Sequence, residues 1–223
     1  MENKNIKSFK EIKKISIKKY LLEKEFSDYK KVPDFKKKDW LAGRFSAKEA
    51  VHNYFLENFQ KDFKLNKIEI LRKEINKPAY KLPIKQTVKT NISISHCEGL
   101  AVSAIAENKT DGLVGIDIEK IRNFKLKEIK SFLTGQELSQ ILKQNLENKN
   151  KIATLFWSIK ESYLKAIGRG LVYHPKFIEL KINLEDKICE LYDKNKKIQA
   201  KIEWQIFKKR YLITKVNILK NKI

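Results

Sequence analysis

The sequence predicts an α+β protein built from two similar halves, each with a helix packed on a small antiparallel sheet. Apolar residues recur with helical spacing in 156–167, and they alternate as strand residues do in 114–119. The order of helix, strand and hairpin occurs twice, with a period of about 110 residues. With 223 residues, of which 42% are hydrophobic, the chain can bury one large core or two small ones.

The first half is expected to contain a helix, a strand and a hairpin, at 43–59, 68–74, 91–95 and 101–106. The second half repeats this order, at 156–167, 177–182, 188–191, 199–207 and 211–219. In this repeat Lys48-Glu49 aligns with Lys160-Glu161. The sequence N-K-T-D-G at 108–112 is typical of a turn, so we expect the domain boundary there, with domains at 1–110 and 111–223.

The most informative helix lies in the segment 154–170, which reads T-L-F-W-S-I-K-E-S-Y-L-K-A-I-G-R-G. Trp157, Glu161 and Lys165 are spaced i, i+4 and i+8, so they form one ridge roughly opposite the apolar stripe. We expect this ridge to point away from the core of its own half, where the other half and a ligand would cover it. The apolar stripe itself is expected to contain Phe156, Ile159, Tyr163 and Ile167.

The segment 114–119 reads V-G-I-D-I-E and is expected to form a strand. Asp117 and Glu119 share the face opposite its three aliphatic residues, about 7 Å apart at the rise of a strand. Gly115 precedes them and admits the close approach of another segment. Two neighbouring carboxylates are unfavourable for stability, but they are well placed to bind a hard divalent cation.

Together the two segments resemble the signatures of the 4'-phosphopantetheinyl transferase superfamily, G-x-D-x-E followed about 40 residues later by W-x-x-K-E-x-x-x-K-x-x-G. The resemblance extends over about 32–181 and points to the longer, monomeric branch, in which two α+β halves meet at a pseudo-two-fold axis. The matching positions are Gly115, Asp117, Glu119, Trp157, Lys160, Glu161, Lys165 and Gly168.

The resemblance implies transfer of 4'-phosphopantetheine from coenzyme A to a serine of an apo acyl or peptidyl carrier protein, with release of 3',5'-ADP. It implies that Asp117, Glu119 and Glu161 bind Mg²⁺, or Mn²⁺ in its place. Glu161, directly or through a metal-bound water, would accept the serine proton. Lys165 would stabilise charge on the phosphates or protonate the leaving group. Lys160 would contact phosphate, or else be a solvated lysine.

Coenzyme A contacts are implied mainly in the first half. The strand end N-I-S-I-S-H at 91–96 is similar to a family segment that places Ser95 and His96 at the 3'-phosphate, although a single histidine is also common as a structural residue. N-K-P at 76–78 resembles a G-K-P segment at the adenine pocket, with Asn in place of Gly. The full set of expected contacts is Arg44, Arg72, Lys77, Pro78, Ser95 and His96.

The net charge of +22 predicts a polyanionic partner, which an acidic carrier protein and coenzyme A would satisfy. A basic nucleic-acid-binding protein without catalysis is the alternative. Only five of the 49 basic residues are arginine, and lysine is spread along the chain, which argues against specific nucleic-acid binding. A relative that binds coenzyme A without turnover is a third alternative, against which the complete carboxylate set and Lys165 argue.

The chain offers no sign of a membrane or secreted protein. No apolar run approaches the ~18 residues of a bilayer span, and the first residues lack the apolar core of a signal peptide. Cys97 and Cys189 match no metal-ligand spacing and no disulfide framework. We therefore expect a cytoplasmic protein with no membrane partner, and the resemblance to the longer branch implies a monomer.

Overall fold

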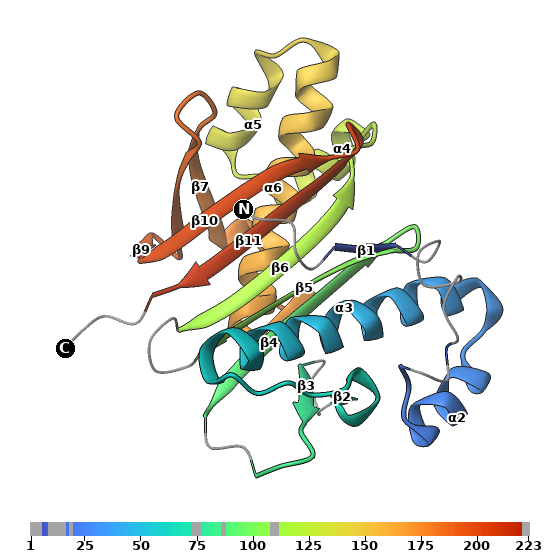
Figure 1. Cartoon of the computed structure of the whole chain (residues 1–223). Helices are drawn as coiled ribbons and strands as arrows, with labels where there is room; N and C mark the ends of the chain where they lie inside the picture. The colour runs from blue at the N-terminus through green and yellow to red at the C-terminus, as the bar shows by residue number, and fades with distance from the viewer. Residues whose placement is uncertain are drawn as a thin grey trace. The chain divides into compact units, whose positions relative to one another are not determined.

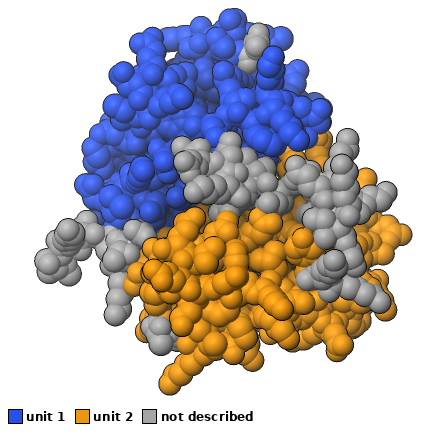
Figure 2. Space-filling model, in the orientation of Figure 1, with its two compact units in different colours: residues 1, 110–223 blue, residues 2–109 orange. Residues whose placement is uncertain are grey.

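The computed structural model describes residues 6–8, 17, 20–72, 77–85, 88–107 and 112–219. Its contacts divide the chain into unit 2 (residues 2–109) and unit 1 (residue 1 with 110–223), coloured separately in Figure 2. Each unit contains a long helix and small antiparallel sheets (Figure 1), which confirms the predicted α+β class. The division does not test the predicted roles of the two halves, which stay predictions.

Unit 2 combines one long helix with a three-stranded sheet of order β1-β5-β4 and a hairpin formed by β2 and β3. The long helix, α3, packs on β4 and β5 (Figure 1). It extends N-terminally beyond the expected start, to directly after Pro33. The elements are β1 (Ile6–Ser8), α2 (Glu23–Lys31), α3 (Asp34–Phe59), β2 (Glu69–Arg72), β3 (Pro78–Lys81), β4 (Thr90–Cys97) and β5 (Leu100–Glu107).

Unit 1 has a central helix, α6, between a three-stranded sheet of order β10-β11-β6 and a second sheet of order β7-β8-β9. Two short helices precede α6 in the chain (Figure 1). The elements are β6 (Leu113–Lys120), α4 (Leu126–Phe132), α5 (Gly135–Leu142), α6 (Leu146–Ile167), β7 (Ile178–Asn183), β8 (Ile188–Asp193), β9 (Lys196–Ile198), β10 (Ala200–Phe207) and β11 (Tyr211–Ile218).

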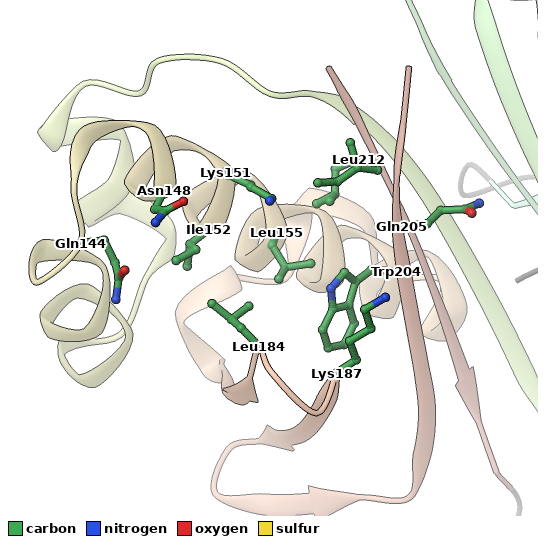
Figure 3. Close-up of a pocket in the computed structure, with 11 residues that line it drawn as sticks. Gln144, Asn148, Lys151, Ile152, Leu155, Leu184, Lys187, Trp204, Gln205 and Leu212 are labelled. Atoms are coloured by element: carbon green, nitrogen blue, oxygen red, sulfur yellow. The ribbon is translucent and has the colours of Figure 1, made fainter. Parts of the chain in front are cut away.

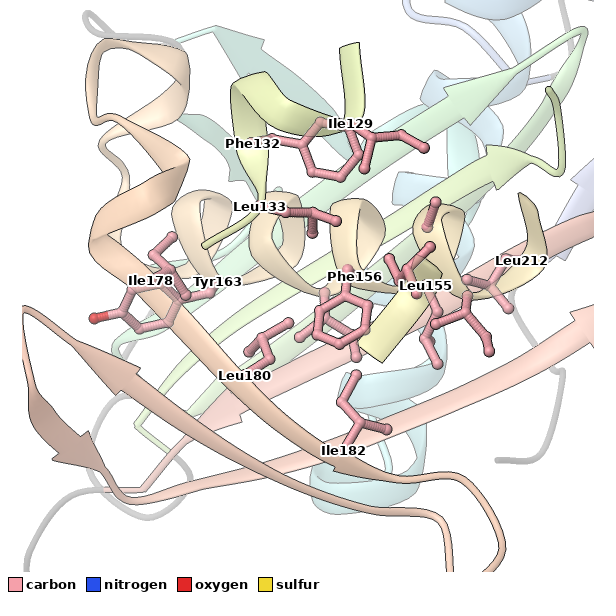
Figure 4. Close-up of a cluster of buried hydrophobic side chains, with 14 of the residues drawn as sticks. Ile129, Phe132, Leu133, Leu155, Phe156, Tyr163, Ile178, Leu180, Ile182 and Leu212 are labelled. Carbon is pink, nitrogen blue, oxygen red and sulfur yellow. The ribbon is translucent and has the colours of Figure 1, made fainter. Parts of the chain in front are cut away.

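Helix α6 has clear signals at both ends. The Asn145 side chain accepts a hydrogen bond from the backbone N–H of Asn148 at the start, and Gly168 adopts a left-handed conformation (φ 69°) at the end. Phe156, Ile159 and Tyr163 of the expected apolar stripe are buried in the main core of the unit, and Ile167 is partly buried against it. Figure 4 shows Phe156 and Tyr163 pointing toward β7 residues such as Leu180. The prediction for this face of the helix is confirmed.

Gly115 sets the distance between α6 and β6. A Cβ atom added at this position would collide with the carbonyl oxygen of Ser162 and lie 2.7 Å from the backbone nitrogen of Ala166. Only glycine therefore allows the helix backbone to lie this close to the strand, as the sequence led us to expect.

Two further expectations can be compared with the structure. Within the described ranges, no helix is long and apolar enough to cross a membrane. Neither Cys97 nor Cys189 forms a disulfide bond.

Candidate active site

Strand β6 and helix α6 bring together the charged residues of the two sequence signatures. Asp117 is 2% exposed, and its Oδ1 accepts a hydrogen bond from the Lys165 ammonium at 2.6 Å. Oδ2 of the same carboxylate accepts from Ser158 Oγ at 2.8 Å. Glu119 Oε1 accepts from the indole Nε1 of Trp157 at 3.2 Å. The strand thus supplies two carboxylates as acceptors, and the helix supplies an amine, a hydroxyl and an indole as donors.

The ridge of Trp157, Glu161 and Lys165 faces β6 of its own unit, so the expectation that it points away from its own half was wrong. Trp157 also packs edge-on against Phe132, with ring centroids 5.1 Å apart. The reason is that α6 is central in unit 1: the apolar stripe faces one layer, and the opposite ridge faces the polar side of β6. Periodicity shows that a helix has two faces, but not that both are covered.

Glu161 is the most perturbed carboxyl group of this site. Burial raises its pKa to about 7, the Lys165 ammonium opposes this rise, and the carboxylates of Asp117 and Glu119 add to it. Its Oε1 is buried and has no hydrogen-bond partner within the described part of the chain. Burial, together with Asp117, also raises the pKa of Glu119. The Trp157 indole, the Lys165 ammonium and the Arg122 guanidinium oppose the rise at Glu119.

Unit 2 contains a cavity of about 250 Å³ that includes three of the residues expected to contact coenzyme A, namely Arg44, Pro78 and His96. The His96 side chain is 53% exposed, and its Nδ1 lies 3.7 Å from a carboxylate oxygen of Asp39. The complete lining is Asp39, Trp40, Gly43, Arg44, Ile70, Leu71, Pro78, Ile94 and His96.

The family model described as the 4'-phosphopantetheinyl transferase superfamily matches residues 113–216, which include both β6 and α6. Holo-[acyl-carrier-protein] synthase of Listeria innocua serovar 6a is 36% identical over 89 residues, which are 40% of this chain and 75% of that protein. The chain belongs to this superfamily.

Other relatives differ in how much of their length is matched. The 4'-phosphopantetheinyl transferase ffp of Bacillus subtilis is 28% identical over 136 residues, so the chain spans 57% of that protein. A solved holo-(acyl-carrier-protein) synthase of Bacillus anthracis str. Ames, in complex with CoA (3',5'-ADP), is 20% identical with a TM-score of 0.41. This match covers 49% of the present chain and 96% of that one. A likeness at this level places no individual residue.

The superfamily resemblance implies a divalent metal at Asp117, Glu119 and Glu161, and the chemistry of these donors fits one. All three are hard oxygen ligands, and the unpartnered Oε1 of Glu161 leaves a buried acceptor for a cation. Among the described residues, however, no three acidic, histidine or cysteine side chains converge as a metal site. Lys165 instead supplies the positive charge at Asp117. The metal site stays a prediction.

Lys160 is not placed to contact a phosphate, contrary to expectation. Its side chain is completely buried, and its ammonium lies 2.7 Å from Glu137 Oε2 and 2.8 Å from the carbonyl oxygen of Phe132. Burial lowers the pKa of this ammonium, an effect that the Glu137 carboxylate opposes. The helical pattern gave no sign of this burial, because lysine is almost never fully buried unless it is paired.

Two residues expected at the nucleotide have other surroundings in unit 2. Ser95 is buried on the face of β4 opposite to His96, because neighbouring strand residues alternate, so the two side chains do not share one site. The Arg44 guanidinium donates to the carbonyl oxygen of Ile70, lies over the Trp40 ring and is 3.7 Å from a Glu25 carboxylate oxygen. The positive charge of Arg44 is therefore already paired with the Glu25 carboxylate.

The remaining expected contacts are only partly described. Lys77 is exposed, next to Pro78 at the start of β3. The side chain of Arg72 and the whole of Asn76 lie outside the described residues.

A larger cavity of about 400 Å³ lies at the N-terminal part of α6 and contains none of the expected site residues. Figure 3 shows Trp204 and Leu212 from the sheet opposite Leu155 of the helix, with Leu184 from the β7–β8 hairpin. No sequence pattern indicated it, because its lining comes from five separate segments. Sequence reasoning also missed Ser158 and Thr214, the hydroxyl residues beside Asp117.

Proposed function

We propose that the protein transfers the 4'-phosphopantetheine group of coenzyme A to a serine of an apo acyl or peptidyl carrier protein and releases 3',5'-ADP. The observation that carries this proposal is the meeting of Asp117, Glu119, Glu161 and Lys165 between β6 and α6, in a member of this superfamily. These four residues come from both signatures and form one charged site.

Asp117, Glu119 and Glu161 would hold the divalent cation, Mg²⁺ or Mn²⁺. When bound, the cation supplies orientation of the pyrophosphate and neutralisation of its charge. The mutual repulsion of the three carboxylates and the unpartnered Glu161 oxygen support this assignment.

Glu161 is the proposed general base. Burial and the neighbouring carboxylates make this group more basic than an ordinary glutamate, and it would accept the serine proton directly or through a metal-bound water. The serine oxygen forms a bond to the β-phosphorus of coenzyme A while the bond from that phosphorus to the bridging oxygen breaks. The serine proton passes to Glu161, and the electron pair leaves on 3',5'-ADP.

Lys165 is proposed to stabilise the leaving group. Its side chain is partly exposed, and a lysine ammonium carries three donor hydrogens. One of them serves the bond to Asp117, and the ammonium would also bind a phosphate oxygen. A positive charge placed where negative charge develops lowers the barrier of the step.

The cavity of unit 2 is the proposed site of the nucleotide end of coenzyme A. Trp40, Pro78 and Ile94 give it apolar surface for a base, and the half-exposed His96 would contact the 3'-phosphate. Lys77, next to Pro78, and Arg72 would add positive charge. The carrier would be acidic, in keeping with the net charge of +22, and the protein is proposed to act as a cytoplasmic monomer.

The direct test is mass spectrometry of several apo carrier proteins after incubation with the protein, coenzyme A and Mg²⁺. We expect a mass increase equal to one 4'-phosphopantetheine group on at least one carrier, and none with the Glu161→Gln variant. Failure to modify any fatty-acid, polyketide or peptide-synthetase carrier would reject the proposal. Tight sequence-dependent binding of DNA instead would favour the nucleic-acid alternative.

A further inference from the structure

Three buried hydroxyl groups lie next to Asp117, and no part of the proposed reaction uses them. Ser158 and Ser162 are one turn apart on α6, and Thr214 lies on β11 directly opposite Asp117 in the antiparallel register. All three side chains are completely shielded from solvent. Serine and threonine hydroxyls are unfavourable in a helix–sheet interface unless they are hydrogen-bonded, so their presence here needs a reason.

The three hydroxyls form a continuous chain that ends on the carboxylate. Ser162 Oγ lies 2.7 Å from Thr214 Oγ1, which lies 2.8 Å from Ser158 Oγ. Ser158 Oγ in turn lies 2.8 Å from Asp117 Oδ2. The close approach permitted by Gly115 brings the helix backbone at Ser162 to the strand, which makes these short distances possible.

The number of protons determines the direction of the chain. Each hydroxyl has one hydrogen, and Ser158 donates its hydrogen to Asp117 Oδ2. The Thr214 hydrogen then points to residue 158, to either the hydroxyl or the carbonyl oxygen at 2.8 Å. The Ser162 hydrogen points to residue 214, to either the hydroxyl or the carbonyl oxygen at 3.1 Å. The Ser158 hydrogen therefore reaches Asp117 itself, while Thr214 and Ser162 hold residues 158 and 214 in place behind it.

We infer that Ser158, Thr214 and Ser162 are positioning residues for Asp117. They commit Oδ2 to the protein interior and hold the carboxylate in one rotamer, so that Oδ1 is presented to Lys165 and to the proposed cation. The role at the cation rests on the proposed function, whereas the coupling of the hydroxyls to Asp117 does not. Hydrogen-bonded partners of a metal ligand typically change metal affinity by about 10–100-fold.

The first test measures the coupling and needs no enzymatic activity. Urea unfolding is compared for the wild type, Thr214→Val, Asp117→Ala and the double variant. Residues in one hydrogen-bond network are not additive, so we expect Thr214→Val to change the unfolding constant by about threefold or more beyond its effect in the Asp117→Ala background. Additive effects would overturn the inference. If Thr214→Val does not fold, Ser162→Ala, at the end of the hydroxyl chain farthest from Asp117, takes its place. The same four-protein comparison is then made, and we expect a smaller coupling with Asp117→Ala.

The second test measures the affinity for Mn²⁺. The protein is titrated with Mn²⁺ in the presence of coenzyme A, and binding is monitored by electron paramagnetic resonance. We expect Ser158→Ala and Thr214→Val to weaken Mn²⁺ binding by about tenfold or more, and Ser162→Ala by less. Ser103→Ala is the matched control, because Ser103 of β5 is equally buried and its hydroxyl has no hydrogen-bond partner among the described residues. It should bind Mn²⁺ like the wild type.

The two tests separate failure of this inference from failure of the proposed function. Unchanged Mn²⁺ affinity in Ser158→Ala and Thr214→Val, in a wild type that binds Mn²⁺, would overturn the positioning role. A wild type that neither binds Mn²⁺ nor modifies any carrier would reject the proposed function, and the unfolding cycle would still decide whether the hydroxyls act through Asp117.

Discussion

Lys160 and Glu137 form an ion pair at 2.7 Å in which neither side chain is more than 1% exposed. Lys48 and Glu25 form the same pair in unit 2, also at 2.7 Å and also buried. In each case a lysine of the long helix meets a glutamate from the first turn of a shorter helix. The two lysines are the positions that align in the sequence repeat, so the pairing is repeated with the fold.

Each glutamate of these pairs also connects two other segments. Glu137 Oε1 accepts from the backbone N–H of Leu180 on β7, and Oε2 accepts from Thr134 N at the start of α5. Glu25 does the same with Ile70 of β2 and with Leu22 at the start of α2. One buried carboxylate therefore joins the long helix, a short helix and a strand in each unit.

Breaking one of these pairs should destabilise the protein strongly. Lys160→Met leaves Glu137 buried without a counter-charge, and we expect a loss of about 3–5 kcal/mol in the free energy of urea unfolding. Adding Glu137→Gln should recover part of this loss, because the remaining group is neutral. Lys151→Met, at an exposed position of the same helix, is the control and should change little. A Lys160→Met variant as stable as Lys151→Met would contradict this account.

Loss of the proposed base should stop the reaction without unfolding the protein. Glu161→Gln keeps the shape of the side chain but removes its basicity, so we expect kcat to fall by about 10²–10⁴-fold. Far-ultraviolet circular dichroism and urea unfolding should show a native fold. Retention of more than a tenth of wild-type kcat would exclude Glu161 as the base.

Removal of a proposed metal ligand should also stop the reaction, so Asp117→Ala should lose turnover. Activity that EDTA does not diminish would exclude the metal.

The raised pKa of Glu161 should make stability depend on pH in a defined direction. The folded-state pKa of about 7 lies above the ordinary 4.5, so the folded protein favours the protonated form. The contribution is fully present below about pH 4.5 and is lost as the pH rises through about 7. Without divalent cations, the wild type should therefore lose stability relative to Glu161→Gln between pH 5 and 8. A constant difference between the two proteins over this range would refute the assignment.

Contact between His96 and the 3'-phosphate should appear as discrimination between two substrates. Charge-assisted hydrogen bonds contribute roughly 1.5–3 kcal/mol, so His96→Ala should raise the KM for coenzyme A by about tenfold or more. The KM for dephospho-coenzyme A should change much less. Ser95→Ala is the neighbouring control, because Ser95 lies on the opposite face of β4. Equal losses with both substrates would leave His96 only a structural role.

The positive charge should accelerate the encounter with an acidic carrier. Raising the salt concentration from about 0.05 to 0.5 M shortens the Debye length from roughly 14 to 4 Å. We expect kcat/KM for the carrier to fall steeply, while kcat at saturating carrier changes little. Carrier modification that is insensitive to salt would argue against electrostatic steering. Duplex DNA should compete at low salt without sequence preference.

The sequence by itself determined the elements whose side-chain period is long and regular. The alternation of 114–119 and the apolar stripe of 156–167 predicted β6 and the core face of α6, and Gly168 marked the end of that helix. The two signatures also identified the superfamily. Period and spacing are local properties of the chain, so they can be read without knowing what packs against each segment. The short helices α4 and α5 have too few residues for such a signal.

Only the tertiary structure decided which partner each polar side chain meets. Lys160 has the spacing of a site residue, yet Glu137, 23 positions away, takes it into the interior. Ser158 and Thr214 carry no motif, and they meet beside Asp117 across 56 positions. A buried charge or hydroxyl is stable only where its hydrogen bonds are satisfied, and those partners come from distant segments. The helix pattern therefore located Glu161 and Lys165, whereas the packing of α6 on β6 determined what surrounds them.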